Sequence, residues 1–70
     1  MSGLDLPQLD GYEVDRVPGF RADKEYLCPG CGNPIPPGAG HVVVWPCEQV
    51  DLRRHWHQHC WRLAVRRGRP

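Results

Sequence analysis

Residues 28–32 read CPGCG and residues 57–60 read HQHC, and these two stretches decide the fold. Two thiolates that are two residues apart can bind one ion only if the chain turns tightly between them. Pro29 fixes φ at the first step of such a turn, and Gly30 and Gly32 are expected to supply its positive φ angles. Residues 28–32 are therefore interpreted as a zinc knuckle.

The second stretch begins and ends with a metal-binding residue, His57 and Cys60. Positions i and i+3 of a first helical turn face the same way, so the imidazole and the thiolate can converge on one ion. Residues 32–56 separate the two pairs, which leaves room for one β-hairpin. The pattern C-x2-C followed by H-x2-C is typical of a closed, tetrahedral structural site. It predicts one structural Zn2+ held by Cys28, Cys31, His57 and Cys60.

Three further histidines and one cysteine lie close to these ligands in the sequence. His55 would share a strand face with His57, whereas His59 lies on a different helical face from the ligands. One alternative is therefore that His55 or His59 replaces His57 as a ligand. Otherwise these two histidines, His41 and Cys47 are expected to be surface or half-buried side chains. Cys47 would lie in a hairpin loop that points away from the knuckle.

The length of the chain makes a metal important for stability. Seventy residues form at most one domain, and a core of that size rarely contributes more than about 3–5 kcal/mol. Eight glycines and eight prolines limit regular structure further. Structural zinc contributes roughly 10–16 kcal/mol in small fingers. Chelation of the metal is therefore expected to unfold residues 26–65.

The protein is expected to be cytoplasmic, and its cysteines are therefore expected to be reduced. The opening residues, MSGLDLPQLDGY, have neither the basic nor the apolar region of a secretory signal. No stretch approaches the roughly 18 apolar residues of a membrane span. Cysteines in such a chain more often hold a metal than form disulfides. A redox pair at Cys28 and Cys31 would need a helix directly after it, whereas the sequence continues GNPIPP.

The segments around the ligands complete the predicted fold. Residues 41–46, HVVVWP, form the clearest strand, because they are β-branched or aromatic and end at a proline. Residues 47–52, CEQVDL, indicate a hairpin loop, and RRHWH at residues 53–57 indicates the returning strand. A short helix follows from His57 and is stopped by Gly68. The predicted fold class is a small, metal-stabilised α+β domain of treble-clef-like form, with a zinc knuckle, a β-hairpin and a short C-terminal helix.

Charge divides the chain into unlike parts, although its formal net charge is only +1. Residues 1–25 carry six acids and three bases, hence −3, and residues 51–70 carry six arginines and one acid, hence +5. The expected organisation is an acidic N-terminal segment at 1–25, a zinc module at 26–67 and a tail at 68–70. The N-terminal segment is either packed across the module, with a short strand beginning at Tyr12, or flexible.

Several motifs resemble known zinc-binding families. Trp56-His57-Gln58-His59-Cys60 matches the WHxxC motif that closes the first zinc module of LIM domains. The stretch 28–61 resembles the zinc fingers of poly(ADP-ribose) polymerases, with Ile35-Pro-Pro-Gly38 as the turn and Trp61 as the following aromatic. Both resemblances imply a treble-clef-like arrangement.

The whole chain also resembles short actinobacterial proteins of uncertain role. They share the CPGC knuckle, the HVVxWP strand and the RRHWHxxCW ending of this sequence. Some of them are labelled ATP/GTP-binding. This sequence does not support that label, because it has no Gly-rich loop followed by Lys-Ser or Lys-Thr and hence no nucleotide-binding loop of that type.

The arginine-rich half and the zinc module together favour binding of nucleic acid. Arginine binds phosphate in a bidentate manner, the side chains of Trp45, Trp56 and Trp61 can stack on unpaired bases, and the resemblance to polymerase fingers implies the same partner. The opposing interpretation places the tryptophans in the core and the arginines at a solvated helix end. The candidate contact residues are Arg53, Arg54, Arg62, Arg66 and Arg67.

The alternative function is a protein–protein adaptor of LIM-like type. A partner strand would then pair with an exposed edge at residues 42–44. Catalysis is not expected, because a closed Cys3His site leaves no open position for water and no carboxylate cluster accompanies the histidines. A membrane partner is not expected either.

Overall fold

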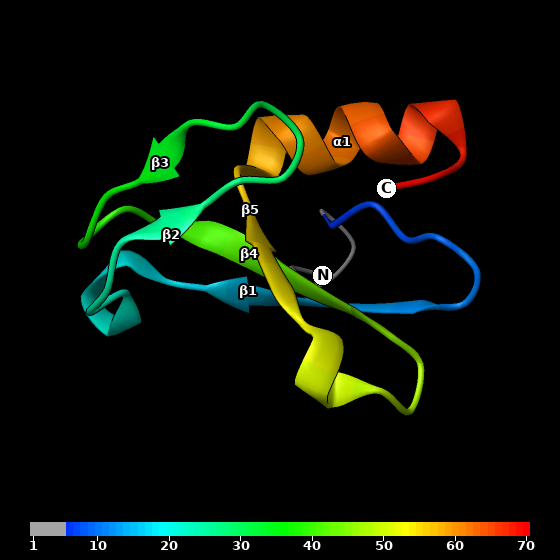
Figure 1. The fold of residues 1–70 in the computed structure, drawn as a ribbon, viewed down its shortest axis with the longest axis horizontal. Helices are drawn as coiled ribbons and strands as arrows, with labels where there is room; N and C mark the ends of the chain where they lie inside the picture. Colours follow the sequence, from blue (N-terminus) through cyan, green and yellow to red (C-terminus); the bar gives the residue numbers. More distant parts are fainter. Residues whose placement is uncertain (1–5) are drawn as a thin grey trace.

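The computed structural model describes residues 6–70 (Figure 1). Its elements are β1 Tyr12–Val17, β2 Tyr26–Leu27, β3 Pro34–Ile35, β4 His41–Pro46, β5 Arg54–Trp56 and α1 Gln58–Arg67, with short 3-10 turns η2 Gly19–Arg21 and η3 Val50–Leu52. The larger antiparallel sheet has the strand order β1-β4-β5, and the smaller one pairs β2 with β3. The chain is thus a small α+β fold. Among the described residues, no helix has the length and apolar character needed to cross a membrane.

The register of the larger sheet decides which side chains face α1. Val14 lies opposite Val44, and Val42 lies opposite Trp56; directly opposed residues point to the same face of a sheet. These four side chains belong to the buried cluster or pack against it. The opposite face carries the alternate residues of the strands, which are Glu13, Asp15, Val17, His41, Val43, Trp45 and His55.

The core lies between α1 and the sheet and contains two tryptophans. Trp61 is fully buried and Trp56 is 4% exposed. Their rings meet edge to face, with 5.4 Å between the ring centroids. Cys28, Ile35, Val42, Val44 and Ala64 complete the buried cluster. The interpretation of these two tryptophans as core residues is confirmed, so neither is available to stack on a base.

The N-terminal segment contributes to this core from residue 6 onward. Leu6 and Leu9 pack against the buried cluster. The indole N–H of Trp61 donates a hydrogen bond of 2.9 Å to the carbonyl oxygen of Pro7, and β1 adds to the sheet beside β4. Residues 6–17 thus lie against the core and the sheet in this structure. Residues 1–5, which the same prediction includes, lie outside the described residues.

The strand and helix predictions have mixed outcomes. Residues 41–46 form β4 as predicted, and α1 ends before Gly68, which takes the left-handed φ of +82°. The predicted exposed edge at residues 42–44 is wrong, because β1 and β5 flank β4 on both sides. The returning strand β5 is shorter than predicted, because Arg53 is the C-cap of η3 and His57 is the N-cap of α1.

Candidate metal centre

Four donor atoms converge where the knuckle meets the start of α1. Cys28 directly follows β2, Cys31 lies in the turn after it, and His57 is the N-cap of α1, with Cys60 in the first helical turn. The sulfur and ring nitrogen atoms of these residues all lie within 4.8 Å of one another. The four side chains therefore lie close enough to hold one metal ion.

Two glycines shape the knuckle for different reasons. The backbone N–H of Gly32 donates to the carbonyl oxygen of Cys28 over 2.8 Å, and Gly32 has a φ of +76°, which a side chain opposes. The expected positive φ at Gly30 is wrong, since its φ is not in that region. A Cβ at Gly30 would instead lie 2.9 Å from Cζ3 of Trp56 and 3.0 Å from Cβ of Cys60. Gly30 therefore permits close packing of the knuckle against the helix.

The distances between donors fit a zinc ion. With Zn–S bonds of about 2.3 Å and Zn–N bonds of about 2.0–2.1 Å, a regular tetrahedron places sulfur and nitrogen about 3.6 Å apart. The Nδ1 atom of His57 lies 3.4 Å from Sγ of Cys31 and 3.9 Å from Sγ of Cys60. Three thiolates and one imidazole are also the donor set of many structural zinc sites. The residues present thus fit zinc in both chemistry and spacing.

Cys28 is held in surroundings that favour its thiolate form. The residue is fully buried, and burial raises the pKa of its thiol. Backbone N–H groups of His57, Cys31 and Gly30 outweigh that burial and lower the pKa to about 7. The N–H of His57 donates to the Cys28 sulfur over 3.4 Å. Such donors around a ligand sulfur spread its negative charge and orient it toward a metal.

Cys60 has a pKa shifted in the opposite direction. Burial, hydrogen bonds with Cys31 and Cys28 and the negative charge of those two sulfurs raise the pKa of Cys60 to about 12. Like charges that share a site disfavour each other. A bound cation reverses this balance, because a thiol that coordinates a metal is deprotonated outright. A bound cation would therefore favour the thiolate form of Cys60 beside the other two sulfurs.

The other candidate ligands lie outside this group. His59 is exposed on α1. Cys47 is exposed after β4, and its thiol lies 3.7 Å from a carboxylate oxygen of Glu13. His55 belongs to the sheet face that points away from α1. The expectation of a surface or half-buried side chain is wrong for His41, which is 2% exposed.

His41 and His55 form a pair that the sequence reasoning did not predict. The Nδ1 atom of His41 lies 2.9 Å from the carbonyl oxygen of Ala39, and its Nε2 atom lies 2.7 Å from Nδ1 of His55. The ring of Tyr26 stacks on His55 with 3.5 Å between centroids. Burial, together with repulsion by the neighbouring His41 and Arg53, lowers the pKa of His55 to about 4. His55 is therefore neutral near pH 7.

The contact between His41 and His55 could have been predicted from the register of the β4–β5 hairpin. Val43 is directly opposite His55, which makes His41 the diagonal neighbour of His55 on the same face. The predicted strands 41–46 and 53–57 contain both histidines at this spacing. Working out their pairing would have brought the two side chains together.

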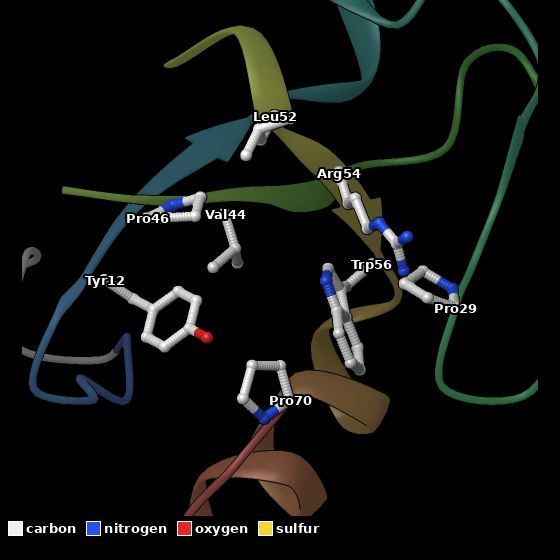
Figure 2. Close-up of a pocket in the computed structure, with 8 residues that line it drawn as sticks. All are labelled: Tyr12, Pro29, Val44, Pro46, Leu52, Arg54, Trp56 and Pro70. Atoms are coloured by element: carbon white, nitrogen blue, oxygen red, sulfur yellow. The ribbon is translucent and has the colours of Figure 1, made fainter. Parts of the chain in front are cut away.

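The predicted arginines all lie at the surface. Arg54 begins β5 and Arg53 directly precedes it, and the remaining three, Arg62, Arg66 and Arg67, lie on α1. Figure 2 shows the side chain of Arg54 beside Pro29, at the rim of a hollow of about 400 Å³ into which the Tyr12 hydroxyl points. The arginines of α1 lie on one side of the sheet, whereas the β1 acids Glu13 and Asp15 point to the other.

Comparisons with known proteins place the chain in a family. Residues 6–62, which include all four donor residues, match the model described as Rv1322 family protein. The uncharacterized proteins Rv1322 of Mycobacterium tuberculosis (strain ATCC 25618 / H37Rv) and Mb1356 of Mycobacterium bovis (strain ATCC BAA-935 / AF2122/97) are each 51% identical over 66 residues, which cover 89% of this chain and 67% of each relative. No solved structure matches the chain. The chain belongs to the Rv1322 family.

Proposed function

We propose that this protein is a zinc-stabilised, non-catalytic module of treble-clef-like form that binds nucleic acid through its exposed arginines. The observation that carries the proposal is the separation of charge in the fold. All five candidate arginines are exposed, and the β1 acids Glu13 and Asp15 lie on the sheet face away from α1. The basic surface of α1 is therefore open to a polyanion.

A purely structural explanation accounts for part of this charge. Arg66 and Arg67 lie in the last turn of α1, where cations interact favourably with the helix dipole. That explanation does not extend to Arg62 in the middle of the helix, or to Arg53 and Arg54 at the start of β5. Exposed guanidinium groups at those positions are available to bind phosphate.

Zinc has a structural role in this proposal. The donor set is closed, with four protein ligands, which leaves no position for a water nucleophile. Its ligands join the knuckle to the start of α1, so the ion holds the arginines of α1 in a fixed place relative to β5. Three thiolates persist in a reducing compartment, and we place the protein in the cytoplasm for that reason.

A salt titration tests the proposal. If five arginines each neutralise one phosphate, the logarithm of the binding constant for duplex should fall with the logarithm of salt concentration with a slope of about −4.5. Fluorescence anisotropy of labelled DNA and RNA measures that slope. Arg62→Gln should reduce the slope by about 1, whereas the matched control Arg21→Gln, in η2, should leave it unchanged. Absence of binding at low salt, or binding that salt does not weaken, would contradict the proposal.

A protein-adaptor role has one observation in its favour. Val50 and Leu52 in η3 are 53% and 54% exposed, and Leu52 lines the hollow of Figure 2 together with Tyr12 and Val44. Apolar side chains at such a hollow can receive an apolar group of a partner. Co-purification of one protein after nuclease treatment, lost in Leu52→Ser, would support this role. Loss of every partner on nuclease treatment would exclude it.

A further inference from the structure

The three cysteines of the metal centre differ in their exposure to solvent. Cys28 is fully buried, whereas Cys60 is half-buried and Cys31 is exposed. The backbone N–H of His57 also donates to the Cys28 sulfur over 3.4 Å. One cysteine of the centre is thus shielded from solutes, and the other two are accessible.

A second hollow, of about 360 Å³, gives access to the two outer cysteines. Cys31 and Cys60 both line it, and Cys28 does not. One water molecule needs only about 10–15 Å³ of such space. A solute of two or three heavy atoms can therefore enter the hollow and reach two of the four metal ligands.

These two cysteines also lie close enough to react with each other. The donor atoms of the metal group all lie within 4.8 Å of one another. The backbone of the knuckle packs tightly on the helix here, since a Cβ at Gly30 would lie 3.0 Å from Cβ of Cys60. Formation of a disulfide then needs the two sulfurs to approach by at most about 3 Å, which side-chain rotation supplies.

We propose that Cys31 and Cys60 are a peroxide-sensitive pair of ligands, and that their oxidation to a disulfide releases zinc. A thiol that coordinates a metal is deprotonated, and the thiolate is the form that attacks an oxidant. The oxidant is hydrogen peroxide, which is small and uncharged. This inference goes beyond nucleic-acid binding and needs only that zinc occupies the centre.

The reaction moves two electrons from the two sulfurs to the peroxide. The thiolate of Cys31 attacks one peroxide oxygen, so that an S–O bond forms, the O–O bond breaks and hydroxide leaves. The thiolate of Cys60 then attacks the sulfur of this sulfenic acid, so that an S–S bond forms, the S–O bond breaks and a second hydroxide leaves. Each hydroxide takes a proton from solvent and becomes water. Cys28 and His57 remain as ligands, fewer than a structural zinc site needs.

The other two pairings of thiols are less favourable. Cys28 is fully buried and lies outside the hollow, so a disulfide between Cys28 and Cys31 would have to expose it. Cys47 is exposed but lies outside the metal group, and its thiol is 3.7 Å from a carboxylate oxygen of Glu13. A neighbouring negative charge disfavours a thiolate. Cys47 therefore serves as an internal control that should react more slowly.

A disulfide between Cys31 and Cys60 would join the same two segments as the metal. Cys31 lies in the knuckle and Cys60 in the first turn of α1, whereas a disulfide between Cys28 and Cys31 would lie within the knuckle alone. The oxidised, zinc-free chain should therefore keep more helix than the reduced, zinc-free chain. Circular dichroism compares the two, and equal loss of helix in both would contradict the inference.

Peroxide treatment of the zinc-loaded full chain is the main test. A chromophoric chelator follows the release of zinc, and peptide mapping without reductant locates the disulfide by mass spectrometry. The expected result is a Cys31–Cys60 disulfide formed in step with zinc release, and a restored site after addition of a thiol reductant and zinc. A Cys28–Cys31 disulfide, or sulfinic and sulfonic acids without any disulfide, would overturn the inference. Zinc that stays bound while Cys47 is oxidised would overturn it too.

Two variants show which sulfur reacts. Cys31→His keeps a ligand of a type that zinc accepts but removes the attacking sulfur, so zinc release by peroxide should slow at least about tenfold. Cys47→Ser is the matched control and should change the rate by less than about twofold, since its thiol is not a ligand. Equal rates in all three proteins would contradict the assignment. If Cys31→His does not fold, the disulfide map of the unaltered chain decides.

The zinc content before oxidation separates this inference from the structural role of zinc. If the chain holds one zinc and peroxide does not release it, the inference fails while the structural role stands. If the purified chain holds no zinc and binds none when it is added, both fail.

Discussion

Replacing Gly30 with alanine tests how tightly the knuckle packs against the helix. The added Cβ would lie 2.9 Å from Cζ3 of Trp56 and 3.0 Å from Cβ of Cys60. Trp56 is 4% exposed and packs edge to face on Trp61, so a shift of its ring would disturb the packing of the core. Cβ of Cys60 is nearly as close as the Trp56 ring, so the backbone of the knuckle is expected to shift as well, and with it the position of Cys31 relative to Cys60.

The cost follows from overpacking. Extra methyl groups in a well-packed core typically cost about 1–3 kcal/mol, and displaced ligands weaken the metal site further. Gly30→Ala is therefore expected to lower the free energy of unfolding by about 2–3 kcal/mol and to reduce zinc affinity. Urea denaturation of the zinc-loaded protein and competition with a chromophoric chelator measure the two effects.

Gly32 provides the matched control in the same turn. A Cβ there meets nothing within 4 Å, but its φ is +76°, so Gly32→Ala should cost about 1–2 kcal/mol through backbone strain alone. Asparagine tolerates that conformation, so Gly32→Asn should recover much of the loss, whereas Gly30→Asn should be worse than Gly30→Ala. The reasoning is refuted if Gly30→Ala unfolds within about 0.5 kcal/mol of the unaltered protein, or if asparagine is tolerated equally at both positions.

Three further predictions concern the cysteines, the N-terminal segment and pH. Cys28→Ser and Cys60→Ser should abolish both zinc binding and folding, which circular dichroism detects. Cys47→Ser, at an exposed thiol beside Glu13, should change the free energy of unfolding by less than about 0.5 kcal/mol. Similar effects of all three substitutions would contradict the ligand assignment. Trp61→Phe removes the indole N–H that donates to Pro7 and should lower the free energy of unfolding by about 1–3 kcal/mol. Amide hydrogen exchange at Leu9 and Tyr12 should become faster. Unchanged exchange at these residues would contradict the described packing. Because the pKa of His55 is lowered from 6.5 to about 4, the unfolded chain binds more protons than the folded chain between those pH values. The free energy of unfolding should therefore fall as pH is lowered through this window, and at saturating zinc His55→Asn should flatten that dependence; an unchanged slope would show that other groups cause it.

The ligand group could be predicted because it depends on short-range spacing. Cys28 and Cys31 are joined by a tight turn, and His57 and Cys60 by the first turn of a helix, so each pair is nearly determined by its own few residues. The strand at 41–46 was predictable for a similar reason, since its residues 42–45 are β-branched or aromatic and a proline follows them. Such local signals do not depend on how distant segments pair.

The position of β1 depends on long-range pairing. Tyr12, Val14 and Arg16 face α1, and the arginine interrupts the apolar alternation that would mark a half-buried strand. Its partner β4 lies some 30 residues further along the chain, so composition alone does not reveal the pairing. The predicted edge at residues 42–44 failed for this reason, because the edge position is taken by β1.

The roles of Gly30 and His41 depend on tertiary contacts. Glycine in a turn suggests a positive φ, but close approach of Trp56 explains Gly30. A histidine at the start of a strand suggests a surface position, but bonds to Ala39 and His55 satisfy both ring nitrogens of His41 and permit its burial. In both cases the deciding neighbour is distant in sequence.

X-ray absorption at the zinc edge of the purified protein, with the zinc content measured on the same sample, tests the central claim most directly. The account predicts one zinc per chain with three sulfur ligands at about 2.3 Å and one nitrogen ligand at about 2.0–2.1 Å, and loss of folded structure when a chelator removes the ion. A chain that contains no zinc and keeps its fold in a strong chelator would contradict it, as would two or more nitrogen or oxygen ligands around the ion.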